Sequence, residues 1–181
     1  MKRRGALFAG VAVVAAAGGL VAAGWRRSGE KAAAPAPDVS GLTGADLYAM
    51  RFDQPDGRAL QLADFAGRPL LLNFWAPWCP PCVTEMPLLD RFHRAQPAQG
   101  WQVVGVAVDQ RDAVQAFLQR HPVAFPIGLA GFEGVALTRR LGNPSGGLPF
   151  SVLLDRAGAI TERKLGAIHG DYLRTLATRG G

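Results

Sequence analysis

The chain has 181 residues, only two of them cysteines, and carries a formal net charge of +6 at pH 7. This length suits one α/β domain with a buried core plus a leader, and it excludes two substantial domains. Much of the positive charge lies in residues 1–38, which hold six basic and two acidic side chains. Because the chain has no stripe of Lys and Arg interleaved with aromatic residues, we expect no nucleic-acid partner.

Residues 1–27 are predicted to be a signal peptide or a membrane anchor. After the basic residues 2–4, the 21 residues from Gly5 to Trp25 carry no charge, and this length is enough to cross a bilayer core of ~30 Å. Small residues at 22–24 would suit signal peptidase, whereas an uncleaved segment 5–25 would anchor the protein to the inner membrane. The leader is compatible with Sec export, and Arg3-Arg4 loosely fits a twin-arginine signal. With either fate, we expect a periplasmic or otherwise extracytoplasmic protein.

The remaining elements follow in chain order. Residues 28–40, rich in Pro and Ala, are expected to form an extended linker, and residues 41–181 the domain. The expected elements are a hairpin (48–52 and 58–62), a helical turn (62–67), a strand (69–75), a helix (83–96), a strand (101–109), a helix (111–121), a strand (125–129), a helix (133–141), a second hairpin (150–155 and 159–165) and a helix (171–178). Alternating strands and helices predict an α/β domain with a central mixed β-sheet flanked by helices on both faces.

Cys79 and Cys82 flank a Pro-Pro pair at the predicted junction between a strand and a helix. Two thiols with this spacing at such a junction are typical of a dithiol redox site. If Cys79 is the N-cap, Pro80 and Pro81 take the first helical positions, where a missing N–H loses no intrahelical partner. The helix N-terminus favours the thiolate. We therefore predict that Cys79 is the exposed nucleophile, that Cys82 is the resolving thiol, and that they form a redox-active disulfide.

The residues between the cysteines also indicate a redox direction. Neither proline offers an N–H to the Cys79 sulfur, and no cation lies between the two thiols, so the thiolate should be only moderately stabilised. A less stabilised thiolate belongs to a less oxidising couple, which favours a reductase or isomerase over a primary oxidant. Half of a zinc site is the alternative, but His93, His121 and His169 are not spaced as a ligand pair. We predict no metal and no cofactor, and we find no motif that gives His121 or His169 a catalytic role.

Residues 73–87, with the sequence NFWAPWCPPCVTEMP, resemble the thioredoxin superfamily. They are similar in particular to the exported TlpA-like group, with its ResA- and CcmG-type disulfide reductases. The resemblance extends from about residue 60 to the C-terminus, and it includes LADFAGRP at 62–69 and GLPF at 147–150. It implies a thioredoxin-like fold with an added N-terminal β-hairpin at 48–62 and a central helix–strand insert at 111–129.

The resemblance assigns roles to three further positions that bind substrate. Pro149 matches the cis-proline that faces the active-site disulfide, and the backbone of Leu148 would then pair with the substrate. Trp78 matches the aromatic residue before the nucleophile, which shields it; a core aromatic is the alternative, and the two roles are compatible.

The resemblance also implies a proton carrier. Glu85 matches an acidic position near the active site, where it would accept or donate the proton of Cys82. The alternative is a solvated glutamate on a helix face. Asn73 stands where thioredoxin has a buried aspartate. Because an amide cannot take up a proton, proton transfer should go through water or Glu85.

The function that the resemblance implies is reduction of protein disulfides by mixed-disulfide exchange. The substrates would be proteins with disulfides or thiols, in cytochrome c or copper-site maturation. A membrane thiol-electron donor of the DsbD or CcdA type would recharge the dithiol. One alternative is a thiol peroxidase of the peroxiredoxin type, although peroxidase cysteines lack a second cysteine two residues on. Another is a non-enzymatic copper carrier that uses Cys79 and Cys82 as soft ligands.

Overall fold

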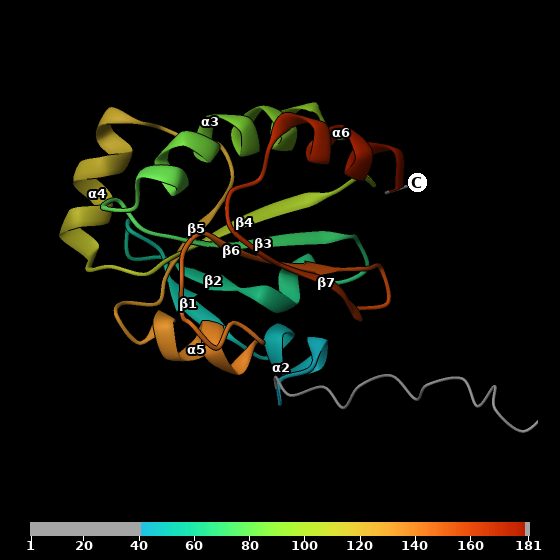
Figure 1. Ribbon diagram of the computed structural model, residues 1–181, viewed down its shortest axis with the longest axis horizontal. Coiled ribbons are helices and arrows are strands. Elements are labelled where there is room, and N and C mark those ends of the chain that lie inside the picture. The colour runs from blue at the N-terminus through green and yellow to red at the C-terminus, as the bar shows by residue number, and fades with distance from the viewer. Residues whose placement is uncertain (1–40, 180–181) are drawn as a thin grey trace, which may run out of the picture. The chain divides into compact units, whose positions relative to one another are not determined.

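The computed structural model describes residues 41–179, so the predicted leader (1–27) and linker (28–40) lie outside the described residues. The described chain is built around a seven-stranded mixed sheet with the order β2-β1-β5-β4-β3-β6-β7 (Figure 1). The central strand β3 (Leu70–Trp75) is parallel to β4 (Gln102–Ala107) and antiparallel to β6 (Phe150–Leu154). The expected mixed sheet is therefore present.

Both predicted hairpins form, and they occupy the two ends of the sheet. At one end, β1 (Arg51–Asp53) pairs antiparallel with β2 (Ala59–Gln61). β1 also joins β5 (Ile127–Leu129), which runs parallel to β4. At the other end, β7 (Ile160–Leu165) pairs antiparallel with β6. The hairpin and the helix–strand insert thus extend the sheet on the same side of β4.

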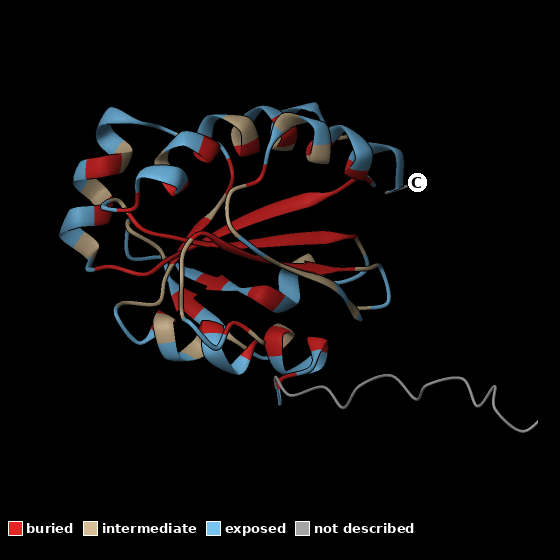
Figure 2. Cartoon of the chain, in the orientation of Figure 1, coloured by how far each residue is buried: buried red, intermediate tan, exposed pale blue. Residues whose placement is uncertain are grey.

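Helices cover both faces of the sheet, as predicted (Figure 1). On one face lie α3 (Pro80–Ala95), α4 (Arg111–Arg120) and α6 (Gly170–Arg179); on the other lie α2 (Gly44–Tyr48) and α5 (Gly134–Arg140). A 3-10 turn (Leu62–Phe65) precedes β3. Figure 2 shows the central strands buried throughout between these layers.

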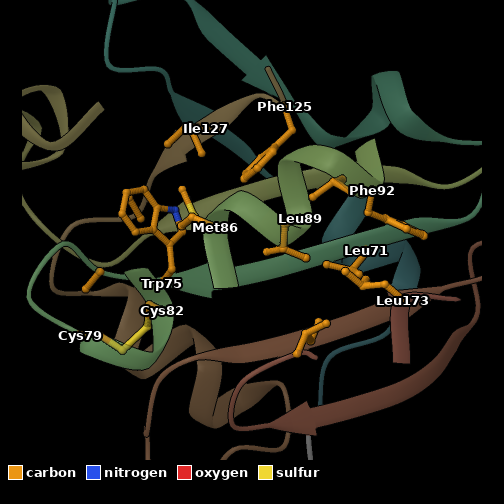
Figure 3. Close-up of a cluster of buried hydrophobic side chains, with 14 of the residues drawn as sticks. Leu71, Trp75, Cys79, Cys82, Met86, Leu89, Phe92, Phe125, Ile127 and Leu173 are labelled. Carbon is orange, nitrogen blue, oxygen red and sulfur yellow. A yellow bond between two sulfur atoms is a disulfide. The ribbon is translucent and has the colours of Figure 1, made fainter. Parts of the chain in front are cut away.

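The sheet has a separate apolar cluster on each face because successive side chains of a strand point to opposite sides. Trp75 packs with Met86 and Leu89 of α3 in one cluster (Figure 3). Its neighbour Phe74 packs with Phe150 in the other, their ring centroids 6.1 Å apart. The strand β3 is consequently fixed from both sides, and its carboxyl end is a rigid starting point for the residues that follow.

Two elements differ from the prediction. The short helix α2 was not expected; the Thr43 hydroxyl caps it by accepting from the Asp46 N–H, and the Asp46 carboxylate accepts from the Thr43 backbone N–H. The helix α3 begins at Pro80, three residues before the range 83–96 but at the position expected if Cys79 is the N-cap. No helix within residues 41–179 combines the length and the apolar character that a membrane span requires.

Candidate functional site

The two cysteines form a disulfide at the start of α3. Cys79 is the N-cap residue, with φ −97° and ψ 103°, and Pro80 and Pro81 occupy the first helical positions. The Cα atoms of Cys79 and Cys82 lie 5.3 Å apart, and their sulfur atoms are bonded (Figure 3). The strand β3 ends at Trp75, so only a short turn separates the central strand from the disulfide. This is the local geometry that the sequence predicts for the dithiol.

The predicted exposure of Cys79 is wrong for this oxidised form. Cys79 is only 4% exposed, and Cys82 is fully buried. Both cysteines belong to the apolar cluster that contains Trp75 and Ala76, and the side chain of Leu148 packs against the same cluster. Cys79 is therefore largely covered in the oxidised form, because it is bonded to the buried Cys82 and belongs to the apolar core.

Trp78 is 59% exposed, which makes it one of the most exposed large apolar side chains of residues 41–179. The alternative interpretation of a core aromatic is thus wrong. An apolar side chain of this size open to water, one residue before the disulfide, suits contact with an apolar segment of a partner. Its predicted role in shielding the nucleophile and binding substrate stays a prediction.

The Leu148–Pro149 peptide bond is cis, the conformation expected from the resemblance. It precedes β6, whose first residue, Phe150, pairs with Phe74 near the carboxyl end of β3. Because the turn to Cys79 also leaves from the carboxyl end of β3, Pro149 and the disulfide both lie at this end of the central strands. The contribution of Leu148 and Pro149 to substrate binding stays a prediction.

Glu85 lies on the buried face of α3, and only 1% of it is exposed. Its Oε1 accepts a hydrogen bond from Asn73 Nδ2 at 2.8 Å, and its Oε2 accepts one from the Ile168 backbone N–H at 2.6 Å. Burial raises the pKa of Glu85, and these two hydrogen bonds and the charge of Lys164 oppose the rise only in part. The solvated glutamate that the sequence left open is wrong, and a carboxyl group with a raised pKa suits proton transfer nearer neutral pH.

Asn73 connects Glu85 to a second buried residue that sequence reasoning missed. Asn73 Nδ2 also donates to Ser151 Oγ at 3.0 Å, and both residues are fully buried. Asn73 Oδ1 is buried and has no hydrogen-bond partner among the described residues. Ser151 comes from β6, 78 residues along the chain. No local pattern in the sequence could have indicated this contact.

The histidines pack against aromatic rings or lie at the surface. His93 meets Phe125 edge-on at 6.2 Å between centroids, and His121 lies 4.8 Å from Phe117. His169 is exposed. Within residues 41–179, no group of three or more His, Cys, Asp or Glu side chains is arranged to hold a metal ion.

The chain is similar to known proteins over most of its length. A model of the redoxin family matches residues 31–177. The thiol-disulfide oxidoreductase ResA of Bacillus thuringiensis (strain Al Hakam) is 30% identical over 112 residues, which cover 61% of this chain and 62% of ResA. ResA of Halalkalibacterium halodurans is 28% identical over 114 residues, with 62% of each chain covered. The match therefore spans less than two thirds of these relatives.

Solved structures with the same architecture cover more of their own length. The structure of MTB dsbF in its mixed oxidized and reduced forms has a TM-score of 0.64 and 26% identity, and it covers 75% of this chain and 97% of that one. A putative thiol:disulfide interchange protein DsbE from Chlorobium tepidum has a TM-score of 0.63 and 26% identity, with 77% and 94% covered. StoA from Bacillus subtilis has a TM-score of 0.57 and 25% identity, with 70% and 94% covered. These similarities confirm the predicted thioredoxin-like fold and the TlpA-like resemblance.

Proposed function

The chain belongs to the redoxin family, and on that premise we propose that it is an exported thiol-disulfide oxidoreductase that reduces protein disulfides. The Cys79–Cys82 disulfide at the N-terminus of α3 carries this proposal. These are the only two cysteines of the chain, so no other internal thiol can exchange with them. The relatives whose names state a thiol-disulfide activity support the same reaction.

The reaction begins with the reduced dithiol. The Cys79 thiolate attacks one sulfur of a substrate disulfide, forms a mixed disulfide, and releases the other substrate sulfur as a thiolate. Cys82 then gives its proton to Glu85 and attacks the Cys79 sulfur. That step forms the Cys79–Cys82 disulfide and releases the second substrate sulfur. Two electrons pass from the protein to the substrate, so a membrane thiol-electron donor of the DsbD or CcdA type must reduce the pair again.

The position of Glu85 on α3 allows it to accept the proton of Cys82. It follows Cys82 by three residues, a spacing that puts two side chains on the same face of a helix. Burial raises the pKa of its carboxyl group above the ordinary value, which brings the group closer to the pH at which a thiol exchanges its proton. In the oxidised form, hydrogen bonds from Asn73 and Ile168 already hold both carboxylate oxygens in place.

Substrates would bind at the edge of the sheet that carries the disulfide. Trp78 offers an exposed apolar surface there, and Leu148 and Pro149 lie at the start of the neighbouring strand β6. An extended segment around a substrate cysteine could lie along this edge and pair with the Leu148 backbone. Export is inferred from residues 1–27, and the substrates are inferred to be apocytochrome c or copper-site cysteines.

The test is a trap for the mixed disulfide. The Cys82→Ser variant retains the nucleophile but cannot resolve the intermediate, so substrates should accumulate on Cys79 in adducts that dithiothreitol releases. A Cys79→Ser, Cys82→Ser double variant is the matched control and should yield no adducts. Insulin reduction by the parent protein should accompany trapping. Peroxide consumption, or stoichiometric Cu(I) binding, with neither adducts nor insulin reduction would overturn the proposal.

A further inference from the structure

Asn73, Glu85 and Ser151 form a buried polar cluster drawn from three elements, β3, α3 and β6. The amide nitrogen of Asn73 bridges the other two side chains, at 2.8 Å from Glu85 Oε1 and 3.0 Å from Ser151 Oγ. On its other side, the amide oxygen has no partner among the described residues, although it is buried. In this orientation the Asn73 amide donates two hydrogen bonds and accepts none, so it suits neighbouring oxygens that act as acceptors.

That state is the one with Glu85 ionised. A carboxylate only accepts hydrogen bonds, so it needs the Asn73 N–H and the Ile168 N–H, which are both aimed at it. When Glu85 takes a proton, the oxygen facing Asn73 becomes a donor and meets the N–H of the amide. Turning the amide by half a revolution resolves this conflict. The Asn73 oxygen then accepts from both the Glu85 O–H and the Ser151 O–H, and the amide nitrogen moves to the side that offers no partner among the described residues.

We propose that Asn73 is a positioning residue whose side-chain amide reverses when Glu85 takes the proton of Cys82, with Ser151 as the hydroxyl that follows the reversal. This inference rests on the proposed reductase function, which supplies the proton. Ser151 suits the role because a hydroxyl both accepts and donates. The Ile168 N–H keeps its acceptor in either state, because the second carboxyl oxygen is a carbonyl when Glu85 is protonated.

The charges around Glu85 are consistent with such a change. Lys164 on β7 is the charged residue that acts on Glu85, and it favours the ionised form. Burial favours the neutral form and is the strongest influence on its pKa. Asn73, Ser151 and the Ile168 backbone are neutral. The two protonation states are thus held by opposing influences, and the amide can offer Glu85 a donor in one orientation and an acceptor in the other.

Nuclear magnetic resonance of the oxidised full chain tests the reversal directly. Across the Glu85 carboxyl titration, we expect contacts from the Asn73 amide hydrogens to the Ser151 and Glu85 side chains at high pH and their loss at low pH. The Glu85→Gln variant imitates the protonated acid, because its amide can donate to Asn73 and its oxygen can face Ile168. It should show the low-pH pattern at every pH. Amide contacts that persist on both sides of the titration would overturn the inference.

A kinetic test uses the rate at which Cys82 resolves a mixed disulfide between Cys79 and glutathione. Without the Asn73 hydrogen bonds, ionised Glu85 is less stable, so Asn73→Leu should move the acidic limb of the pH profile upward. A displacement of one pH unit lowers the rate about tenfold on that limb and leaves the high-pH plateau unchanged. Ser151→Ala should move it in the same direction, by less. Gln102→Leu removes a comparable buried amide from β4, one that donates to Phe65 O at 2.7 Å, and should leave the profile in place.

The results separate the two proposals. An equal loss of rate at all pH values, or an unmoved limb in both Asn73→Leu and Ser151→Ala, would reject the positioning role. The pH titration of the parent protein by resonance requires neither folding of a variant nor a substrate. Failure of the Cys82→Ser trap would remove the reductase function, whereas a static amide in the oxidised protein would remove this inference alone.

Discussion

Replacing Trp78 with alanine should weaken substrate binding without unfolding the protein. A tryptophan side chain has roughly 250 Å² of surface. With 59% of Trp78 open to solvent, about 150 Å² is available to a partner. If a substrate covers half of that area, then about 75 Å² at ~25 cal/mol per Å² contributes about 2 kcal/mol. The loss corresponds to a decrease of about 30-fold in kcat/KM.

The assay is insulin reduction at substrate concentrations below KM, alongside urea unfolding of each variant. Phe132→Ala is the matched control, because Phe132 is also 59% exposed but lies just before α5. We expect the control to keep kcat/KM within about twofold, since an isolated exposed aromatic side chain carries little energy of its own. The reasoning fails if Trp78→Ala reacts like the parent, or if Phe132→Ala loses as much activity.

Two further predictions concern stability, and both are measured by urea unfolding. Because burial raises the pKa of Glu85, the free energy of unfolding includes a contribution that is present at acid pH and is lost as pH rises through the folded pKa. Glu85→Gln should therefore gain stability relative to the parent between pH 4 and pH 8, and a constant difference would contradict this. Gly44→Ala should cost about 3 kcal/mol, because its Cβ would lie 1.7 Å from Gly158 O. The control Gly170→Ala should stay within about 0.5 kcal/mol, because its nearest neighbour is the flexible Arg174 at 3.6 Å.

The fold could be predicted from the sequence because its signals are local. Continuous apolar runs marked the two central strands, and glycine and proline marked the turns between elements. The missed helix α2 also had a local signal: Thr43 followed three residues later by Asp46 is a variant of the capping box, but the helix has only five residues. The start of α3 at Pro80 agrees with the Pro-Pro pair, which is typical of a first helical turn, and not with a start at Val83.

The spacing of residues along α3 indicates the burial of Glu85. Cys82, Glu85, Met86 and Leu89 follow the spacing of one helix face, and the other three are apolar residues of the core. A glutamate at a position of that series is expected to be buried together with its apolar neighbours. Its partners could not be predicted, since Ser151 and Ile168 come from β6 and the loop after β7. Such contacts depend on the order of strands in the sheet, which no local pattern encodes.

The exposure of Cys79 was wrongly predicted for a related reason. A helix N-terminus predicts where a thiolate is stabilised, whereas exposure depends on what packs above it. Cys79 belongs to an apolar cluster whose members come from several strands and helices, and Leu148, almost 70 residues away, packs against that cluster. The stabilisation of the thiolate can thus be predicted from the local sequence, whereas the burial of Cys79 depends on the tertiary structure.

The contrast between Cys79 and Trp78 limits which substrates suit the proposed function. In the oxidised form Cys79 is nearly covered, whereas the aromatic side chain beside it is mostly open. A folded partner with a recessed disulfide would meet Trp78 before it could approach Cys79. An extended segment, by contrast, can lie against Trp78 and bring its own sulfur to the edge of the sheet where Pro149 lies. The exposed Trp78 and the covered Cys79 together favour substrates whose cysteines lie in unfolded segments. A protein that is still undergoing maturation has such segments.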